Sequence, residues 1–311
     1  MATIRNCLAE LCMKQQVIDL MSDFTIETTP GSAAKIPDYR EHLRPGCVVA
    51  VTFLPGSDYN DTIATVKRLR DEGFVPVPHI VARSIPSERD LTNFLDAVTG
   101  ESGVDHVVAL AGAVDKPLGP YDSSMALLET GQFDRVGIRR IGVAGHPEGS
   151  PDISDELLQQ AIDFKNDFAN RSDADLYLVT QFVFEAEPVI AWDKAIRASG
   201  NTLPIHVGIP GLASLKALIG HARACGIGAS MSFLTRQARN VARLLKVQSP
   251  DKLIIDLARY KAENADAGIH KVHLYPLGGL RRTAGYGYAL VDGKFDIGRH
   301  GTGFRLHEKI E

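Results

Sequence analysis

The chain has 311 residues, of which 44% are hydrophobic and 23% are charged, as is typical of a globular protein with a sizeable core. Its formal net charge is -4, and the short basic pairs Arg139-Arg140 and Arg281-Arg282 do not form an extended basic surface, so we expect no nucleic-acid partner. No apolar run reaches the length of about 18 residues that a membrane span needs, so we expect no membrane partner.

The N-terminus and the cysteines indicate a cytoplasmic location. The first residues lack the basic start and the apolar stretch of about 7–15 residues that mark a secretory signal. The four cysteines form no CxxC pair and no Cys/His spacing typical of zinc: Cys7, Cys12, Cys47 and Cys225. We therefore expect a cytoplasmic protein with reduced thiols and no bound metal.

Taken in chain order, the pattern begins with a helix and continues with eight short apolar runs. The spacing of apolar residues between Ile4 and Met21 predicts an N-terminal helix within residues 1–21. Several of the later runs are continuous rather than alternating, as expected for parallel strands covered on both faces. The predicted strands are Phe24–Glu27, Cys47–Phe53, Val75–Ile80, His106–Leu110, Arg140–Ala144, Leu176–Gln181, Leu203–Ile209 and Lys271–Tyr275.

Segments with helical spacing separate these runs. Strand and helix alternating in this way predict an α/β fold of the (β/α)8 TIM-barrel type, in one domain over residues 1–311. The long stretch before the last strand predicts two extra helices, and residues 283–311 predict a C-terminal extension with a hairpin at Asp292-Gly293. The helices are Thr62–Asp71, Glu88–Val98, Asp155–Phe168, Val189–Ser199, Leu212–Ala224, and the extra pair Thr235–Lys246 and Asp251–Ala265.

Polar residues stand at the ends of the predicted strands, where a barrel of this type carries its active site. Glu27 follows the apolar positions Phe24 and Ile26, and apolar surroundings favour the neutral form of a carboxyl group. This makes Glu27 a candidate proton donor. The alternative is a glutamate that caps a helix or forms a salt bridge.

The other strand ends carry candidate binding residues, each with a structural alternative. His79 and His146 are either cofactor contacts or framework residues, and the amide of Gln181 suits a heterocycle that both donates and accepts hydrogen bonds. Phe233 and Tyr275 are candidate stacking surfaces or core residues. The chain shows no phosphate loop of the GxxxxGK[ST] type, no strand-linked GxGxxG and no recognisable catalytic triad.

In order along the chain, several motifs resemble those of the methylenetetrahydrofolate reductase family. They are ETTP at Glu27–Pro30, VTF at Val51–Phe53, PHI at Pro78–Ile80, VVALAG at Val107–Gly112, VAGHPE at Val143–Glu148, VTQFVF at Val179–Phe184, GIPG at Gly208–Gly211 and HLY at His273–Tyr275. The resemblance implies a barrel in which FAD passes a hydride from NADH or NADPH to a folate.

The resemblance also implies roles for single residues. Glu27 becomes the acid that protonates the folate while its five-membered ring opens, and hydride addition to the exocyclic methylene then gives a methyl group. Gln181, Phe233 and Tyr275 become substrate contacts. The flavin-side contacts become Thr52, His79, Gly112, Ala144 and His146.

The chain departs from the family pattern in its flavin-binding residues. Where the family has Arg-Gly-Asp, this chain has Ala111-Gly112-Ala113. In the family, polar side chains on the helix after the fifth strand also hold the flavin. Here that helix reads AIDFKND, in which Asp163 and Asp167 would repel a pyrophosphate, whereas Lys165 could bind it.

Three functional hypotheses therefore stay open. We favour a flavin-dependent reductase, because the folate-side elements and several backbone-side elements are present. The second hypothesis is a flavin-free reductase in which NADH or NADPH delivers the hydride directly, with Glu27 as the acid. The third is a folate-binding protein or methyltransferase without redox activity. Each allows a homo-oligomer, and none distinguishes the two nicotinamide dinucleotides or the physiological direction.

Overall fold

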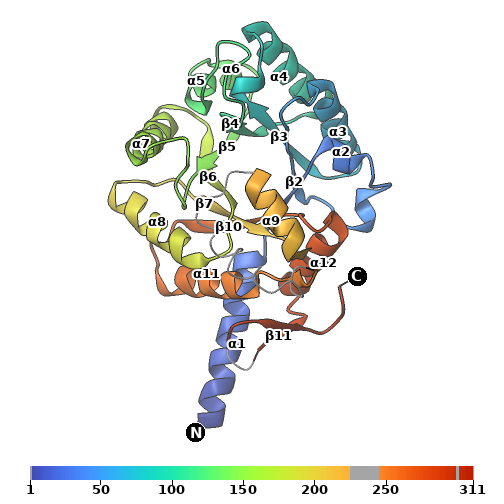
Figure 1. Cartoon of the computed structure of the whole chain (residues 1–311), viewed down its shortest axis with the longest axis vertical. Helices are drawn as coiled ribbons and strands as arrows, with labels where there is room; N and C mark the ends of the chain where they lie inside the picture. The colour runs from blue at the N-terminus through green and yellow to red at the C-terminus, as the bar shows by residue number, and fades with distance from the viewer. Residues whose placement is uncertain (1, 225–244, 299–300, 311) are drawn as a thin grey trace. The chain divides into compact units, whose positions relative to one another are not determined.

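The computed structural model describes residues 2–224, 245–298 and 301–310 of the chain (Figure 1). Within these residues, eight parallel strands close into a barrel in the order β1-β10-β7-β6-β5-β4-β3-β2. The expected (β/α)8 barrel is thus confirmed. Its strands are β1 (Thr25–Thr28), β2 (Val48–Val51), β3 (Val75–Val81), β4 (His106–Leu110), β5 (Arg140–Gly145), β6 (Asp175–Phe182), β7 (Ile205–Pro210) and β10 (Ile269–Tyr275).

Helices connect the strands, as the apolar spacing predicts. Those that follow the N-terminal helix α1 (Ala2–Met21) are α2 (Pro30–Ala33), α3 (Tyr59–Asp71), α4 (Glu88–Ser102), α5 (Ser124–Leu128), α6 (Gln132–Arg135), α7 (Asp155–Arg171), α8 (Ala186–Ala198), α9 (Leu215–Ala224), α11 (Asp251–Glu263) and α12 (Leu280–Val291). Short 3-10 turns lie at Tyr39–Glu41 and Ala82–Ser84.

Helix α4 shows why these segments become helices. The hydroxyl of Ser87 accepts the backbone N–H of Asp90 and so caps the first turn. One face, formed by Leu91, Phe94, Leu95 and Val98, is buried, because these positions recur at helical spacing. Gly103 ends the helix in the left-handed conformation, with φ of 57°.

The described residues form two compact units, which we name unit 1 and unit 2. Unit 1 comprises Met1–Phe24, His146–Leu158 and Thr180–Glu311, and unit 2 comprises Thr25–Gly145 and Gln159–Val179. Strand β6 contributes residues to both. The expectation of a single domain over residues 1–311 stays a prediction.

In unit 1, the N-terminal helix packs on the C-terminal helices. Figure 1 shows α1 beside α11 and α12, and Val17, Leu20 and Met21 of α1 are buried there. A second apolar cluster joins Phe182 of β6 to Leu215 and Leu218 of α9. Two antiparallel pairs complete the unit: β8 (Ala213–Ser214) with β9 (Val247–Gln248), and β11 (Phe295–Ile297) with β12 (Phe304–Leu306).

In unit 2, strands β1 to β5 are paired in parallel from one neighbour to the next, with α3 packed against α4. The register places Glu27 opposite Ala50 and Thr28 opposite Val51. Because neighbouring parallel strands run in the same direction, the residues that follow β1 and β2 come to the same edge of the sheet.

The extra helices before the last strand are observed in part. Helix α11 confirms the helix expected over Asp251–Ala265. The helix expected over Thr235–Lys246 lies almost entirely outside the described residues. Among the described residues, none of the helices combines the length and the apolar composition that a membrane span requires.

The hairpin expected at Asp292-Gly293 is wrong. The preceding residues form helix α12, whose buried face includes Leu280, Ala284 and Leu290. Gly293, with φ of 64°, ends this helix: its N–H bonds the carbonyl of Leu290, and the next N–H, that of Lys294, bonds the carbonyl of Ala289. An Asp-Gly pair therefore stops a helix at this point rather than turning a hairpin. The hairpin of this tail is the later pair β11 and β12.

Candidate functional site

Glu27 lies in β1 and is joined to Thr52, the residue after β2. The hydroxyl of Thr52 donates to Oε2 of Glu27 at 3.0 Å, and the backbone N–H of Thr52 donates to the carbonyl of Thr28 at 2.8 Å. Both side chains are half-buried. The structure thus brings two predicted site residues together, and it gives the Thr52 hydroxyl a carboxylate partner within the protein.

The rest of the ETTP motif fixes the chain directly after Glu27. The hydroxyl of Thr28 lies 2.8 Å from that of Tyr39, in a buried contact. Thr29 caps α2 by accepting the N–H of Ser32, and Pro30 occupies the first turn, where a missing N–H costs nothing. Each residue after the carboxylate therefore has a structural reason for its type.

His79 and Gly112 are the next predicted contacts in unit 2. His79 is buried in β3, opposite Val108 of β4. A Cβ added to Gly112 would lie 2.4 Å from Cγ1 of Val81, and the φ of Gly112 is +98°, which side-chain-bearing residues rarely adopt. Packing within the protein is sufficient to explain the glycine.

The loop that carries Ala111-Gly112-Ala113 is tied to the residues after β3. The backbone N–H of Arg83 donates to the carbonyl of Ala111, and the Arg83 guanidinium donates to the carbonyls of Val114 and Asp122, at 3.3 and 2.8 Å. The Arg83 guanidinium is therefore directed at backbone oxygens, whereas Lys116, the basic residue nearest this loop in sequence, is exposed.

Lys165 occupies the buried face of α7. It is 3% exposed, and its Nζ donates to the carbonyl of Ala144, in β5, at 2.8 Å. Burial lowers the pKa of Lys165 to about 8, because removal from water disfavours the charged form. The two predicted flavin contacts Ala144 and Lys165 thus meet each other.

The contacts of Lys165 and Arg83 bear on whether the predicted residues of unit 2 could bind the pyrophosphate of FAD. A pyrophosphate needs accessible positive charge or free N–H groups. Lys165 is buried against Ala144, Arg83 bonds carbonyls, and Asp163 and Asp167 are exposed on α7. The predicted flavin-side residues of this unit therefore fit a pyrophosphate poorly.

In unit 1, the predicted substrate contacts Gln181 and Tyr275 lie around Gly208 of β7. A Cβ on Gly208 would lie 2.6 Å from the carbonyl oxygens of Gln181 and Thr180, and 2.7 Å from Cε2 of Tyr275. The Tyr275 hydroxyl donates to the carbonyl of Thr180 at 2.9 Å, and its ring meets that of Phe182 edge-on. This close approach explains why position 208 is a glycine.

Gln181 is exposed, unlike its neighbours Thr180 and Phe182. Its Oε1 accepts the backbone N–H of Phe182 at 3.1 Å, which fixes the orientation of the amide. The Nε2 group of this exposed side chain therefore has a defined direction.

Two predicted site residues remain, His146 and Phe233. His146 is half-buried, and its carbonyl accepts the N–H of Gly149 in the turn after β5. Phe233 lies outside the described residues. Among the described residues, no group of three or more His, Cys, Asp or Glu side chains is arranged to hold a metal ion.

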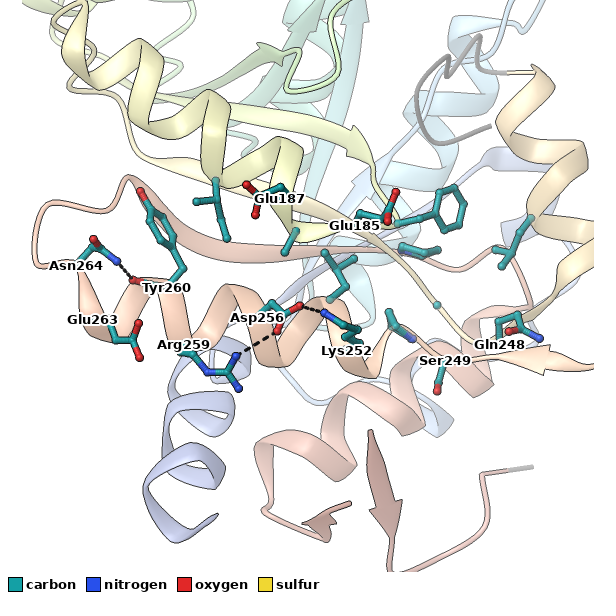
Figure 2. Close-up of a pocket in the computed structure, with 18 of the residues that line it drawn as sticks. Glu185, Glu187, Gln248, Ser249, Lys252, Asp256, Arg259, Tyr260, Glu263 and Asn264 are labelled. Atoms are coloured by element: carbon teal, nitrogen blue, oxygen red, sulfur yellow. Dashed lines mark hydrogen bonds and ion pairs between the residues drawn. The ribbon is translucent and has the colours of Figure 1, made fainter. Parts of the chain in front are cut away.

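A groove of about 710 Å³ lies in unit 1, lined by residues of α8 and α11 (Figure 2). Asp256 bonds both Lys252 and Arg259 on the helix surface. The lining carries four acids and three bases, so its charges nearly cancel and favour neither an anion nor a cation: Glu185, Glu187, Asp256, Glu263, Lys194, Lys252 and Arg259. We assign no ligand to this groove.

The sequence interpretation missed a cluster in which Glu72 bonds both Arg68 and the backbone of Tyr39, and the Tyr39 hydroxyl contacts that of Thr28. Arg68 and Glu72 are spaced as an ion pair on a helix, which is a readable signal. Their contacts with residues 33–39 are long-range, and no spacing in the sequence indicates them.

Comparison with known proteins identifies the relatives of this chain. A family model described as methylenetetrahydrofolate reductase matches residues 38–279. Methylenetetrahydrofolate reductase 1 of Schizosaccharomyces pombe is 28% identical over 146 residues, which are 44% of this chain and 22% of the relative. Methylenetetrahydrofolate reductase 2 of Saccharomyces cerevisiae is 28% identical over 124 residues, which are 38% of this chain and 18% of the relative. The match thus spans about a fifth of these relatives.

A solved structure shares the fold. It is an uncharacterized protein from Clostridium thermocellum that binds two copies of 5-methyl-5,6,7,8-tetrahydrofolic acid, with a TM-score of 0.55 and 15% sequence identity. The similarity covers 90% of this chain and 96% of the other. Because the family model spans most of the barrel, from before β2 to the end of β10, the chain belongs to the methylenetetrahydrofolate reductase family.

Proposed function

We propose that this protein interconverts 5,10-methylenetetrahydrofolate and 5-methyltetrahydrofolate, with NADH or NADPH as the hydride source in the direction of reduction. Family membership supports this reaction, and the folate bound by the Clostridium thermocellum protein supports the ligand class. The observation that carries the proposal is the carboxyl group of Glu27, held at the end of β1 by the hydroxyl of Thr52.

In the proposed reaction, Glu27 gives its proton to N10 of the folate. The bond between N10 and the bridging methylene breaks, N10 keeps the bonding electrons and the proton, and N5 becomes an iminium ion. A hydride then adds to the exocyclic carbon and gives the N5 methyl group. Thr52 donates to the carboxyl oxygen Oε2 and so orients the carboxyl group at the end of β1. A positioned acid of this kind typically contributes about 10²–10⁴-fold in rate.

The remaining predicted residues have proposed binding roles. Gln181 would donate from its directed Nε2 to an acceptor of the pterin ring, and Tyr275 and Phe233 would contact the folate. His79, Gly112, Ala144, His146 and Lys165 would lie on the side of the hydride donor. For Gly112, Ala144 and Lys165, packing within unit 2 offers an alternative explanation.

The route of the hydride is the second part of the proposal. The family resemblance implies FAD as the carrier. Two contacts in unit 2 weaken this route, because they direct the cations of Lys165 and Arg83 at backbone carbonyls rather than at a pyrophosphate. NADH and NADPH carry the same pyrophosphate group, but direct transfer from the nicotinamide needs no separate FAD site. With direct transfer, Glu27 and Gln181 keep their roles.

Substitution of Glu27 by glutamine tests the acid. Glutamine keeps the shape and can accept from Thr52, but its amide is not acidic enough to transfer a proton to N10. We expect turnover to fall by at least about 100-fold, with the dissociation constant for 5-methyltetrahydrofolate within about threefold of wild type. The matched control is Glu41→Gln, at an exposed position in the same unit. Wild-type turnover in Glu27→Gln would remove Glu27 from the mechanism.

The absorbance spectrum of the purified protein tests the route. Direct transfer predicts a protein without flavin absorbance that oxidises NADH or NADPH only when methylenetetrahydrofolate is added. A yellow protein that bleaches with the nicotinamide would establish the flavin route. A colourless protein that binds folate tightly but oxidises neither nicotinamide would support the non-redox hypothesis instead.

A further inference from the structure

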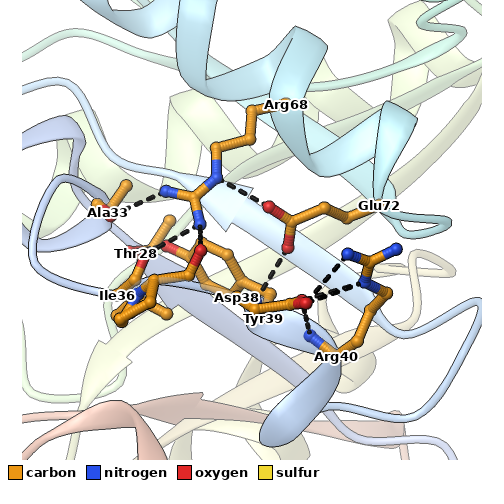
Figure 3. Close-up of polar contacts among 9 residues, drawn as sticks. Thr28, Ala33, Ile36, Asp38, Tyr39, Arg40, Arg68 and Glu72 are labelled. Carbon is orange, nitrogen blue, oxygen red and sulfur yellow. Dashed lines mark hydrogen bonds and ion pairs between the residues drawn. The ribbon is translucent and has the colours of Figure 1, made fainter.

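The segment between β1 and β2 is held by one arginine of helix α3. Nη1 of Arg68 donates to the carbonyl of Ala33 at 2.9 Å, and Nη2 donates to the carbonyl of Ile36 at 2.7 Å (Figure 3). Nε of Arg68 donates to Oε1 of Glu72, the C-cap residue of the same helix, at 2.7 Å. A planar guanidinium with fixed donors can hold several acceptors in one geometry, which a lysine could not do.

Glu72 and Arg68 together fix Tyr39. Oε2 of Glu72 accepts the backbone N–H of Tyr39 at 2.8 Å, and the Arg68 guanidinium lies 5.2 Å from the centroid of the Tyr39 ring. The Tyr39 side chain is fully buried and packs edge-on against Phe74. Burial raises the pKa of Tyr39, because removal from water disfavours the charged form.

The Tyr39 hydroxyl meets the strand that carries Glu27. It lies 2.8 Å from Oγ1 of Thr28, the residue directly after Glu27. The carbonyl of Thr28 accepts the N–H of Thr52, whose hydroxyl bonds Glu27. Thr28 is therefore fixed by its side chain to Tyr39 and by its backbone to Thr52, and a continuous set of contacts runs from Arg68 to the carboxylate.

We propose that Tyr39, held by Arg68 and Glu72, is a positioning residue that fixes the end of β1 and thereby the carboxyl group of Glu27. This proposal rests on the proposed function, in which Glu27 is the acid. Tyr39 touches neither substrate nor the reacting atoms in this scheme; it acts through Thr28. Proton transfer depends steeply on the alignment of donor and acceptor, so a small displacement of the strand end lowers turnover.

The test removes the contact between the hydroxyl groups of Tyr39 and Thr28, by substituting one residue or the other. Tyr39→Phe and Thr28→Val each delete one hydroxyl and keep the size of the side chain. We expect each to lower kcat by about tenfold, with KM for the folate within about twofold of wild type, and to alter the alkaline limb of the pH profile of kcat, because a general acid acts only in its protonated form. The double variant should be no slower than the slower single one, because the contact is already lost.

Two controls separate positioning from a general loss of structure. Arg40→Ala removes the exposed ion pair with Asp38, next to Tyr39, and should leave kcat and its pH profile unchanged. Thr28→Ser keeps the hydroxyl and should recover most of the turnover lost in Thr28→Val.

The possible outcomes distinguish this inference from the proposed function. If Glu27→Gln is inactive but Tyr39→Phe and Thr28→Val keep wild-type kcat and pH profile, the positioning role is wrong and the acid stands. If Glu27→Gln keeps full turnover, the proposed acid itself is wrong. A fall of kcat in Tyr39→Phe with an equal fall in Arg40→Ala would also overturn the positioning role. Should Tyr39→Phe not fold, the comparison of Thr28→Val with Thr28→Ser decides the question.

Discussion

Thr52 in unit 2 and Thr180 in unit 1 both lie at strand ends, but their hydroxyl groups bind different partners. The Thr52 hydroxyl donates to a carboxylate, that of Glu27, at 3.0 Å. The Thr180 hydroxyl accepts the N–H of Gly208 at 2.9 Å and donates to the carbonyl of Gln181 at 2.8 Å, so both its partners are backbone groups. Thr52 is half-buried, whereas Thr180 is 1% exposed.

The two threonines therefore have different expected roles: Thr180 stabilises the backbone, whereas Thr52 orients the proposed acid. In unit 1, Thr180 and Tyr275 satisfy backbone groups at the ends of the strands, and Gln181 is the exposed residue beside them, for which we propose a ligand. In unit 2, backbone bonds already hold β1 against β2, so the Thr52 hydroxyl is available for Glu27. We therefore expect substitutions around Thr180 to act mainly on stability and substitutions at Thr52 to act mainly on activity.

The largest stability effect is expected for Gly208→Ala in unit 1. The added Cβ would meet two carbonyl oxygens at 2.6 Å and the ring of Tyr275 at 2.7 Å, so the backbone must shift. We expect a loss of about 3–4 kcal/mol in the free energy of unfolding, measured by urea denaturation. The control is Gly285→Ala in α12, where the nearest neighbouring atom lies 3.4 Å from the added Cβ. A stability of Gly208→Ala equal to that of the control would contradict the close packing around β7.

Lys165→Met should change how stability depends on pH in unit 2. The pKa of Lys165 is about 8 in the folded protein, against 10.5 ordinarily. Between these values the unfolded chain binds more protons than the folded one, so the free energy of unfolding rises with pH, by up to about 3 kcal/mol. Methionine lacks the ionisable group and should remove this rise.

Urea denaturation between pH 7 and pH 10.5 measures this effect as the difference between wild type and variant. At pH 7, where wild-type Lys165 is buried in its charged form, Lys165→Met should be the more stable of the two proteins. Lys67→Met, at an exposed position on α3, is the control and should keep the wild-type dependence. The same rise with pH in wild type and Lys165→Met would mean that Lys165 does not titrate in this range.

Thr180→Val is expected to have a smaller effect on stability. Valine keeps the shape but leaves the buried N–H of Gly208 without its acceptor, which costs about 1–3 kcal/mol in the free energy of unfolding. Thr180→Ser keeps both hydrogen bonds and should lie within about 1 kcal/mol of wild type. If the valine variant is as stable as the serine variant, the hydroxyl is not needed for the strand ends of unit 1.

Much of the fold could be predicted from the sequence, because buried parallel strands are continuous apolar runs. Seven of the eight predicted strands differ from the observed ones by a few terminal residues, and His106–Leu110 coincides with β4. The C-terminal hairpin failed because Asp-Gly is used both by tight hairpin turns and by helix ends. The apolar residues of α12 favour a helix over a hairpin here, because Leu280, Ala284 and Leu290 are buried on one face of the helix.

The sequence predicted single residues of the candidate site but not the contacts between them. The pattern placed Glu27 at the end of a strand, but its contact with Thr52 depends on the register of β1 against β2. The burial of Lys165 had a readable signal, since it lies three residues from both Ile162 and Phe168 on the apolar face of α7. The contacts of Tyr39 and Arg68 join distant segments, and no local pattern records them.

Thr52→Val is expected to change stability least, and it tests the comparison of Thr52 with Thr180 most directly. The variant loses the hydrogen bond to Glu27 but keeps the backbone N–H that bonds Thr28, so we expect the free energy of unfolding to change by less than about 1 kcal/mol. A carboxyl group without this donor is less well oriented, so kcat should fall by about tenfold.

Thr52→Val should thus lose turnover and keep its stability, whereas Thr180→Val should mainly lose stability. The same urea denaturation and the same turnover assay measure both variants. Thr52→Ser supplies the hydroxyl again and should recover turnover. If Thr52→Val lost stability as Thr180→Val does while its kcat stayed at the wild-type value, both threonines would serve the backbone. Glu27 would then have to be oriented by other groups, and the division between stability and chemistry at the two strand ends would not hold.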